Sequence, residues 1–239
     1  MDCFLGMKRI FDTKDFVRFK RLKEELYNIK LFKRRKKVFN RIYSNKRWPS
    51  IETVSGPGST IEYTESIRKE IPRLIEEFKV RTILDAPCGD YNWFRLIDRN
   101  EDVKYIGGDI VESLIEKNNE CFTDNNTQFV VLDICSDKLP KADIWLCRDC
   151  LFHLSNKEII KAIENFLKSD IPYLLTSTHN RCNENKNIRT GGFRLLNLEI
   201  FPFNFSQPIL YIDDWIEGYA ERKLALWSKE ALKDIKFDL

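Results

Sequence analysis

The pattern of apolar and polar positions between residues 60 and 230 predicts short buried strands that alternate with helices. Runs rich in Val, Ile, Leu and Phe predict strands, and apolar residues spaced three and four apart predict helices. The predicted strands are 83–86, 103–109, 128–133, 143–147, 171–177, 208–212 and 223–227. Helices are expected over 110–122 and 155–167. This alternation indicates an α/β fold, in which helices cover both faces of a mostly parallel sheet.

Local signals refine several of these elements. Ser155 and Glu158 have the spacing of a capping box, which predicts the start of helix 155–167. A helix that begins near residue 63 is expected to be interrupted at Pro72 and to continue to residue 78. Residues 91–97 are also helix-like. The segment 178–207 has no period, and its phenylalanines favour an ordered functional loop.

The first fifty residues have a different character. Apolar residues from Phe16 to Tyr43 recur at helical spacing with Lys and Arg between them, which predicts an amphipathic helix, broken near Lys33. Trp48-Pro49-Ser50 is expected to end it, and the loop Ser55-Gly-Pro-Gly-Ser59 follows. We therefore expect a helical extension over 1–50 and an α/β domain over 51–239.

Charge is distributed unevenly between these two parts. Residues 1–50 hold 16 Lys and Arg against 5 Asp and Glu, a net charge of +11, whereas the remainder carries −8. The run Lys33-Arg-Arg-Lys-Lys37 could meet an anionic membrane, a nucleic acid or a phosphorylated substrate, or could simply be a solvated helix face. Peripheral membrane contact through residues 8–47 is one expectation, and the oligomeric state stays open, a dimer included.

Composition excludes some classes of protein. Of the 239 residues 43% are hydrophobic, which is enough for a core, but no run of 18 apolar residues predicts a membrane span. The start of the chain is too short in apolar length for a signal peptide. Seven cysteines without paired spacing indicate reduced thiols and a cytoplasmic protein. Cys147 and Cys150 lack a second pair, so no metal site is expected.

Acidic residues follow the predicted strands. Asp85, Asp109 and Asp133 end the first three strands, and Asp149 lies just after the fourth. Ligands of open α/β sheets bind beyond the carboxyl ends of the strands, so these side chains are expected to share one site. An acid after the second strand can accept hydrogen bonds from both ribose hydroxyls of an adenosine.

The loop after the first strand distinguishes two cofactor classes. A dinucleotide pyrophosphate requires several bare backbone N–H groups and no nearby anion, and the G-x-G-x-x-G motif is absent. The loop Ala86-Pro-Cys-Gly89 has one glycine and lies between Asp85 and Asp90. A ligand with an ammonium and a sulfonium would tolerate these acids, and S-adenosylmethionine carries both cations.

Asp85-Ala-Pro-Cys-Gly-Asp90, Asp109 and Leu132-Asp133 together resemble the cofactor motifs of class I S-adenosylmethionine-dependent methyltransferases over residues 60–178. The resemblance implies a Rossmann-like, seven-stranded sheet whose last strand is antiparallel. It also implies a methionine site in the loop after the first strand, a ribose site at the second strand and an adenine site after the third. The implied cofactor residues are Asp85, Ala86, Pro87, Cys88, Gly89, Asp109, Ile110, Asp133, Ile134 and Arg148.

A closer resemblance extends over residues 55–228. Ser55-Gly-Pro-Gly-Ser59, Cys147-Arg-Asp-Cys-Leu-Phe-His-Leu-Ser155 and Leu224-Ala-Leu-Trp227 are similar to a group of bacterial methyltransferases associated with surface-polysaccharide gene clusters. The group includes enzymes thought to methylate sugar hydroxyls or a phosphoramidate group on capsule sugars. Many of its relatives carry Trp before the arginine of a Thr-Gly-x-x-Arg motif, where this chain has Phe193. Residues 1–50 lie outside the resemblance.

Methyl transfer to a hydroxyl calls for a base, and the chain has two histidines. His153 lies four residues after Asp149, which could orient it if the segment is helical. His179 follows the fifth strand and is the other candidate for a base or a substrate contact. Either histidine could equally serve packing alone.

The acceptor is less well defined. Arg148-Asp-Cys-Leu151 stands where DNA amino-methyltransferases carry an Asn/Asp-Pro-Pro-aromatic motif, which argues against nucleic acid and for an oxygen acceptor. A small molecule, a glycan or a nucleotide-linked sugar is the expected acceptor class. A methyltransferase for nucleic acid or another small molecule, and a scaffold that binds cofactor without turnover, are the alternatives. The candidate acceptor contacts are Tyr63, Trp93, Arg181, Arg189 and Arg194.

Overall fold

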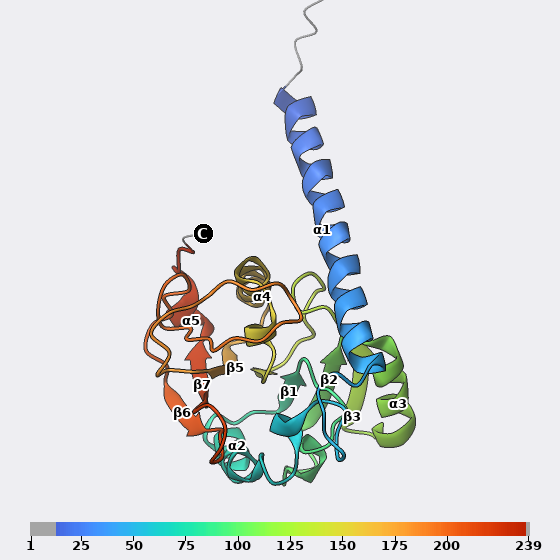
Figure 1. Ribbon diagram of the computed structural model, residues 1–239, viewed down its shortest axis with the longest axis vertical. Coiled ribbons are helices and arrows are strands. Elements are labelled where there is room, and N and C mark those ends of the chain that lie inside the picture. Colours follow the sequence, from blue (N-terminus) through green and yellow to red (C-terminus); the bar gives the residue numbers. More distant parts are fainter. Residues whose placement is uncertain (1–12, 238–239) are drawn as a thin grey trace, which may run out of the picture.

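A seven-stranded sheet with the order β3-β2-β1-β4-β5-β7-β6 organises the chain, as the computed structural model of residues 13–237 shows (Figure 1). Strands β1 to β5 are parallel, and β7 runs antiparallel to both of its neighbours, β5 and β6. The strands are β1 (Thr82–Asp85), β2 (Lys104–Asp109), β3 (Thr127–Val131), β4 (Ile144–Cys147), β5 (Tyr173–Thr178), β6 (Leu210–Asp213) and β7 (Lys223–Ser228). The predicted fold class is confirmed, including the antiparallel last strand.

Alternate residues of the strands feed two hydrophobic cores, one on each face of the sheet, because side chains of a strand alternate between faces. On one face, Leu84 and Trp145 pack with α4 (Asn156–Lys168) and with the loop after β5. On the other face, Ile83 and Leu146 pack with α2 (Glu65–Glu77) and α3 (Glu112–Phe122). A short helix, α5 (Lys229–Leu232), follows β7. Helices on both faces were the sequence expectation.

Some local expectations were wrong. Helix α2 continues through Pro72 without interruption. Only a 3₁₀ turn, Phe94–Leu96, forms within the helix-like segment 91–97. Ser155 is the N-cap of α4 as predicted, but its side chain makes no capping bond to the backbone. Its hydroxyl instead donates to the carboxylate of Glu158, which also pairs with Arg35.

The segment between β5 and β6 is a long irregular loop, as expected, and it is packed rather than open. Leu196, Leu198 and Phe203 are fully buried within the core on the α4 face. Gly191 has a φ of +91°, a left-handed conformation that a side chain would strain. A Cβ at this position would lie 2.5 Å from Cγ1 of Val38, so the loop passes very close to the N-terminal helix.

Helix α1 (Thr13–Ser44) is continuous, so the expected break near Lys33 was wrong. No proline or glycine interrupts residues 13–44. Its C-terminal half packs on the domain, and its N-terminal half projects away from it (Figure 1). Residues 1–12, part of the predicted extension, lie outside the described residues. Within residues 13–237 no helix combines the length and apolar character needed to cross a bilayer.

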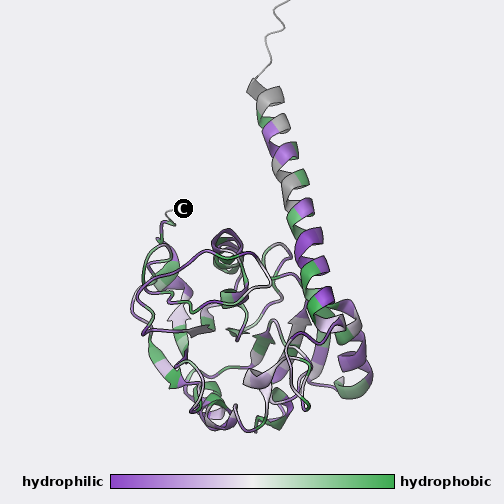
Figure 2. Ribbon diagram, viewed as in Figure 1, coloured by the Kyte–Doolittle hydropathy of each residue, from purple (hydrophilic) through white to green (hydrophobic). Residues whose placement is uncertain are grey.

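The expected amphipathic character of α1 does not hold over the whole helix. Apolar residues occur along its described part with polar ones between them (Figure 2). At about 100° per residue, Leu26 and Ile42 lie about 160° apart around the axis. Ile42 is buried against the domain, whereas Leu26 is 58% exposed. The two halves of α1 therefore present apolar residues on nearly opposite sides.

Candidate active site

A cavity opens at the carboxyl ends of β1, β2 and β4. The ends of neighbouring parallel strands meet at one edge of a sheet, which brings residues distant in sequence to the same place. The predicted site residues that line the cavity are Asp85, Pro87, Cys88, Gly89, Trp93, Asp109, Ile110, Asp133, Ile134, Arg148, Asp149 and His153. Ala86 is fully buried beside it, where its carbonyl accepts a hydrogen bond from Trp145 Nε1.

Asp85 ends β1 as a buried carboxyl group. The hydroxyl of Tyr105 donates a 2.8 Å hydrogen bond to its Oδ2 atom. Burial nevertheless raises the pKa of Asp85 to about 7, because the charged form loses its hydration. A positive ligand in the cavity would stabilise the charged form.

Asp109 ends β2 and is held by the backbone. Its Oδ1 accepts the N–H of Val111 at 2.9 Å, and its Oδ2 accepts the N–H of Gly89 at 3.3 Å. Burial outweighs these bonds and raises its pKa to about 6. Gly89 has a φ of +56°, and a Cβ there would lie 2.2 Å from Ser55 Oγ. This glycine therefore lets the loop after β1 close tightly between Asp109 and Ser55.

Asp133 differs from these two acids because its carboxylate is already occupied. Oδ2 lies 2.6 Å from Nη2 and 3.0 Å from Nε of Arg35, a residue of α1. Oδ1 accepts bonds from Arg35 Nε and from the N–H of Cys135. A carboxylate offers about four acceptor positions, and these contacts use them. Although the resemblance implies an adenine site after the third strand, a bond from Asp133 to the exocyclic amine of the adenine is therefore not supported.

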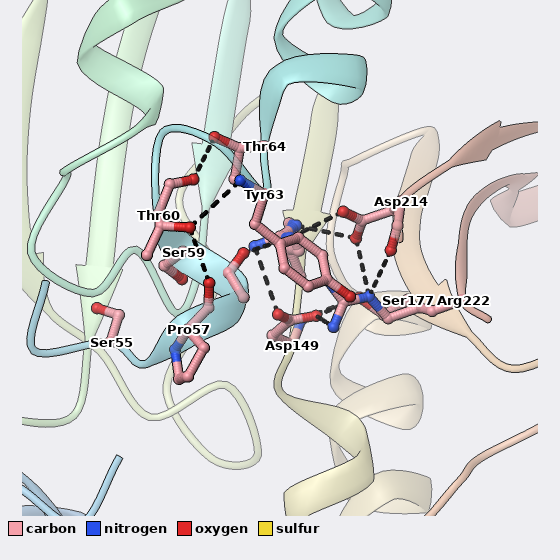
Figure 3. A network of polar contacts seen from close by, with 12 residues as sticks. Ser55, Pro57, Ser59, Thr60, Tyr63, Thr64, Asp149, Ser177, Asp214 and Arg222 are labelled. Carbon is pink, nitrogen blue, oxygen red and sulfur yellow. Dashed lines mark hydrogen bonds and ion pairs between the residues drawn. The ribbon is translucent and has the colours of Figure 1, made fainter. Parts of the chain in front are cut away.

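Arg148 and Asp149 line the cavity and belong to a buried network of charges with Asp214 and Arg222. Figure 3 shows Asp149, Asp214 and Arg222 of this network. Arg148 forms two bonds with Asp214, of 3.0 and 2.8 Å, and its guanidinium lies 5.3 Å from the centre of the Trp93 ring. Arg222 joins the same Asp214 at 3.0 Å. The role of Arg148 is thus to link the cavity wall to the β6–β7 hairpin, in addition to lining the expected cofactor site.

Asp149 does not orient His153, contrary to the expectation. Its Oδ1 accepts a bond from Ser177 Oγ at 3.1 Å and pairs with Arg222 at 3.0 Å. Although burial alone would raise its pKa, Arg148 and Arg222 hold the pKa of Asp149 below its ordinary value. Its φ of +52° is strained for a non-glycine residue. Asp149 therefore serves as a charged member of the network and is a poor proton acceptor.

His153 lines the cavity and is oriented by a backbone carbonyl. Its Nδ1 lies 2.6 Å from the carbonyl oxygen of Gly192, and its ring stacks on Trp48 at 5.0 Å. A carbonyl oxygen can only accept, so Nδ1 carries the proton and Nε2 of the neutral ring is a free acceptor. Burial lowers the pKa of His153, which favours this neutral form. In this state the ring can accept a proton at Nε2.

His179 does not share this position. It is 3% exposed and is absent from the cavity wall, and its Nδ1 accepts the N–H of Leu196 at 3.2 Å. Burial lowers its pKa to about 4. The imidazole therefore organises the loop after β5, and the proposed catalytic role of His179 is not supported.

The three loop arginines do not gather at the cavity. Arg181 is exposed and pairs with Glu221, and Arg189 is exposed in a separate surface pocket. Arg194 is buried and donates to the carbonyl of Leu154 and to Asn156 Oδ1. Arg181 and Arg194 have partners within the protein, and Arg189 lies in a different pocket. Their expected role in acceptor binding is therefore not supported.

Tyr63 and Trp93, the two aromatic candidates, are both buried. Tyr63 lies beside the charge network, with its ring centre 4.9 Å from the guanidinium of Arg222 (Figure 3). Trp93 lies in the cavity wall, whereas Tyr63 is not among the residues that line the cavity. Only Trp93 is therefore placed to touch a ligand in the cavity directly.

Among the residues of the cavity wall that sequence reasoning missed, four come from α1 or the segment just after it. They are Arg35, Phe39, Tyr43 and Trp48. The basic run 33–37 did single out Arg35, but nothing in the run distinguishes it from its exposed neighbours. The pair Asp214 and Arg222 was missed as well, because no motif connects β6 and β7 to the cavity.

Comparisons with known proteins bear on the fold. No protein-family model matches this chain, and no curated protein matches it by sequence. Solved structures do match. The methyltransferase domain of bacterial CtHen1 aligns with a TM-score of 0.52 and 11% identity, over 70% of this chain and 99% of that one.

Two further structures agree. The N-methyltransferase NodS from Bradyrhizobium japonicum WM9 aligns with a TM-score of 0.52 and 12% identity, over 70% of this chain and 96% of that one. Magnesium protoporphyrin IX methyltransferase from Synechocystis PCC 6803, solved with bound S-adenosylmethionine, aligns with a TM-score of 0.51 and 16% identity, over 80% and 96%. At such identities the likeness concerns the fold alone. The chain therefore has the Rossmann-like fold of the S-adenosylmethionine-dependent methyltransferases.

Proposed function

We propose that the protein is an S-adenosylmethionine-dependent methyltransferase. The observation that carries this proposal is the pair of buried carboxyl groups, Asp85 and Asp109, whose pKa values are raised at the edge of one cavity. Such a pair favours a cationic ligand and disfavours a pyrophosphate. Asp109 accepts the backbone N–H groups of Val111 and Gly89, one at each oxygen, and a carboxylate has further acceptor positions that could serve the hydroxyls of a ribose.

We infer an oxygen acceptor from the arrangement of His153. When bound, the cofactor would supply an electrophilic methyl carbon. His153 Nε2 would take the proton of an acceptor hydroxyl as its oxygen forms the new bond to carbon and the carbon–sulfur bond breaks. The fixed tautomer supports this role, since Gly192 already accepts the Nδ1 proton. A phosphoramidate oxygen is already anionic and would require no base.

The acceptor proposed is a sugar hydroxyl or a phosphoramidate group of a bacterial surface polysaccharide or its nucleotide-linked precursor. The support is the similarity of the segments 55–59, 147–155 and 224–227 to methyltransferases of that group. Residues of the first two segments line the cavity, and the third belongs to β7, where Leu224 pairs with Ser177 of the charge network. The proposed setting is the cytoplasm, where nucleotide-linked precursors are made.

Calorimetry with S-adenosylhomocysteine, followed by turnover assays with candidate sugars, tests the proposal. We expect binding by the native chain and its loss in Asp109→Ala. No binding of either S-adenosylmethionine or S-adenosylhomocysteine would exclude a methyltransferase. Binding without turnover on any acceptor would indicate a scaffold, and RNA affinity that persists in moderate salt would indicate a nucleic-acid acceptor.

We also propose that the N-terminal half of α1 contacts a membrane surface. Leu22, Leu26 and Ile29 lie on one helix face and are 49%, 58% and 49% exposed, and Lys30 and Lys33 are exposed nearby. Co-sedimentation with vesicles should be stronger for anionic than for neutral lipid and should weaken in a Leu26→Glu, Ile29→Glu variant. Equal sedimentation of the native chain and the variant would contradict membrane contact. Self-association of the native chain in ultracentrifugation would instead favour a dimer.

A further inference from the structure

We propose that helix α1 forms one wall of the cofactor site, and that Arg35 is the positioning residue that holds α1 in this place. This inference rests on the proposed methyltransferase function. It concerns a segment that lies outside the sequence resemblance and that composition alone marks as a basic arm.

Arg35 behaves unlike the basic run that contains it. Arg34 and Lys37 are exposed, whereas Arg35 is 2% exposed. Its Nη2 donates to Asp133 Oδ2 and its Nε to Asp133 Oδ1, the two-bond geometry preferred by guanidinium and carboxylate, and its Nη1 lies 3.2 Å from Glu158 Oε1. One positive charge is thus buried between two acids, one after β3 and one on α4. Withdrawal of α1 would leave both acids without this partner.

Helix α1 and the segment just after it supply aromatic side chains to the cavity wall. Phe39 and Tyr43 of α1 and Trp48 just after it line the cavity together with Asp109 and Asp133. The rings of Phe39 and Trp48 are 6.5 Å apart. Flat apolar rings beside a ribose-binding acid are a suitable surface for a purine base. Since the carboxylate of Asp133 is engaged by Arg35, we infer that contact with this aromatic wall contributes more to adenine binding than a bond to Asp133.

The same helix touches the elements that orient the base. Val38 and Ile42 pack against Gly191, whose N–H donates to the carbonyl of His153. The next residue, Gly192, accepts the Nδ1 proton of His153. Thr190, in turn, donates to Glu158, the second partner of Arg35. The position of α1 therefore influences both the adenosine side of the cavity and the orientation of His153.

Hydrogen exchange of the native full-length protein gives the first test. If α1 covers the cofactor, saturating S-adenosylhomocysteine should slow amide exchange over residues 31–44 by about tenfold, as coupled sites commonly do. The projecting part of α1, residues 17–26, serves as the internal control and should not change. Cofactor binding with no slowing over 31–44 would overturn the inference while leaving the proposed function intact. Failure of the native chain to bind would contradict the function itself.

Variants of Arg35 give the second test. We expect Arg35→Ala to weaken S-adenosylhomocysteine binding by about tenfold or more. Arg35→Lys should recover part of the loss, and the exposed Arg41→Ala on the same helix should bind normally. In turnover, KM for the cofactor should rise more than KM for the acceptor. A purely structural role would lower the active fraction, and hence kcat, without this change in KM, and would contradict the inference.

A third variant covers the case in which Arg35→Ala does not fold. Tyr43→Ala removes part of the aromatic wall and leaves the Arg35 contacts in place. It should raise the Kd for S-adenosylhomocysteine several-fold at an unchanged melting temperature. Normal binding by a folded Tyr43→Ala protein would overturn the role of α1 as the wall of the site.

Discussion

The Nδ1 atom of His153 lies 2.6 Å from the carbonyl oxygen of Gly192, and this contact defines which ring nitrogen can accept a proton. Gly192 belongs to the loop that follows β5, some forty residues further along the chain. The orientation of the proposed base therefore depends on a loop that also packs against α1.

Replacement of His153 by Gln should lower kcat by about 10² to 10⁴ for a hydroxyl acceptor and leave the Kd for S-adenosylhomocysteine nearly unchanged. Because burial lowers the pKa of His153, the native enzyme should stay active at a pH somewhat below the ordinary histidine pKa and lose activity as the ring protonates. Steady-state rates across pH 4.5 to 8 check both points. Full turnover by His153→Gln would show that it is not the base.

Asp85 and Asp109 should each stabilise the unliganded protein less as pH rises from about 4 to about 7. Their folded pKa values of about 7 and about 6 lie above those of the unfolded chain, so the folded state binds more protons in that window, and each ionisation costs on the order of 3 to 4 kcal/mol. His179, whose folded pKa of about 4 lies below that of the unfolded chain, acts in the opposite direction, so the native chain is compared with Asp109→Asn. In thermal melts from pH 4 to 8, Asp109→Asn should gain stability relative to the native chain as pH rises, and a difference that does not change with pH would contradict the assignment. S-adenosylmethionine should raise the melting temperature of the native chain more at pH 7.5 than at pH 5.

Asp214→Ala should destabilise the fold by about 3 to 5 kcal/mol, because it leaves the buried Arg148 and Arg222 without their shared carboxylate. The neighbouring Asp213 is a matched control. It is exposed and pairs with Lys223, so Asp213→Ala should cost no more than about 1 kcal/mol. Urea denaturation of both variants measures the difference. Equal effects would mean that the buried network contributes no more than the surface pair.

Gly191→Ala should cost more than Gly218→Ala, although both glycines have a φ of +91°. The backbone strain of alanine in this conformation is common to the two, at about 1 to 2 kcal/mol. A Cβ at position 191 would additionally meet Val38 at 2.5 Å, whereas nothing lies within 4 Å of one at position 218. Denaturation should separate the variants, and Gly191→Ala should also lower kcat through the adjacent Gly192. A kcat equal to that of Gly218→Ala would show that the loop does not position His153.

The sequence by itself determined the sheet and the acids at its edge. Short apolar runs predict buried strands. Because parallel strands share a direction, the residues that follow these runs lie together at the edge of the sheet formed by the carboxyl ends of the strands. Asp85 and Asp109 could be placed together for this reason. Local sequence patterns could not predict whether Pro72 would interrupt α2, since packing of the apolar face of the helix can compensate for one missing backbone hydrogen bond.

Only the tertiary structure decided what each polar side chain contacts. Asp149 precedes His153 by four residues, yet Asp149 is itself left-handed and His153 ends a 3₁₀ turn, so the segment is not an α-helix. The carboxylate of Asp149 pairs instead with Arg222, the residue just before β7. Arg35 looked like one member of a solvated run, but contact with Asp133 made it part of the cavity wall. Spacing along a chain determines which side chains share a face of one element. The partner of a charged group depends on which elements pack together, because a buried charge must meet an opposite charge wherever the fold supplies one.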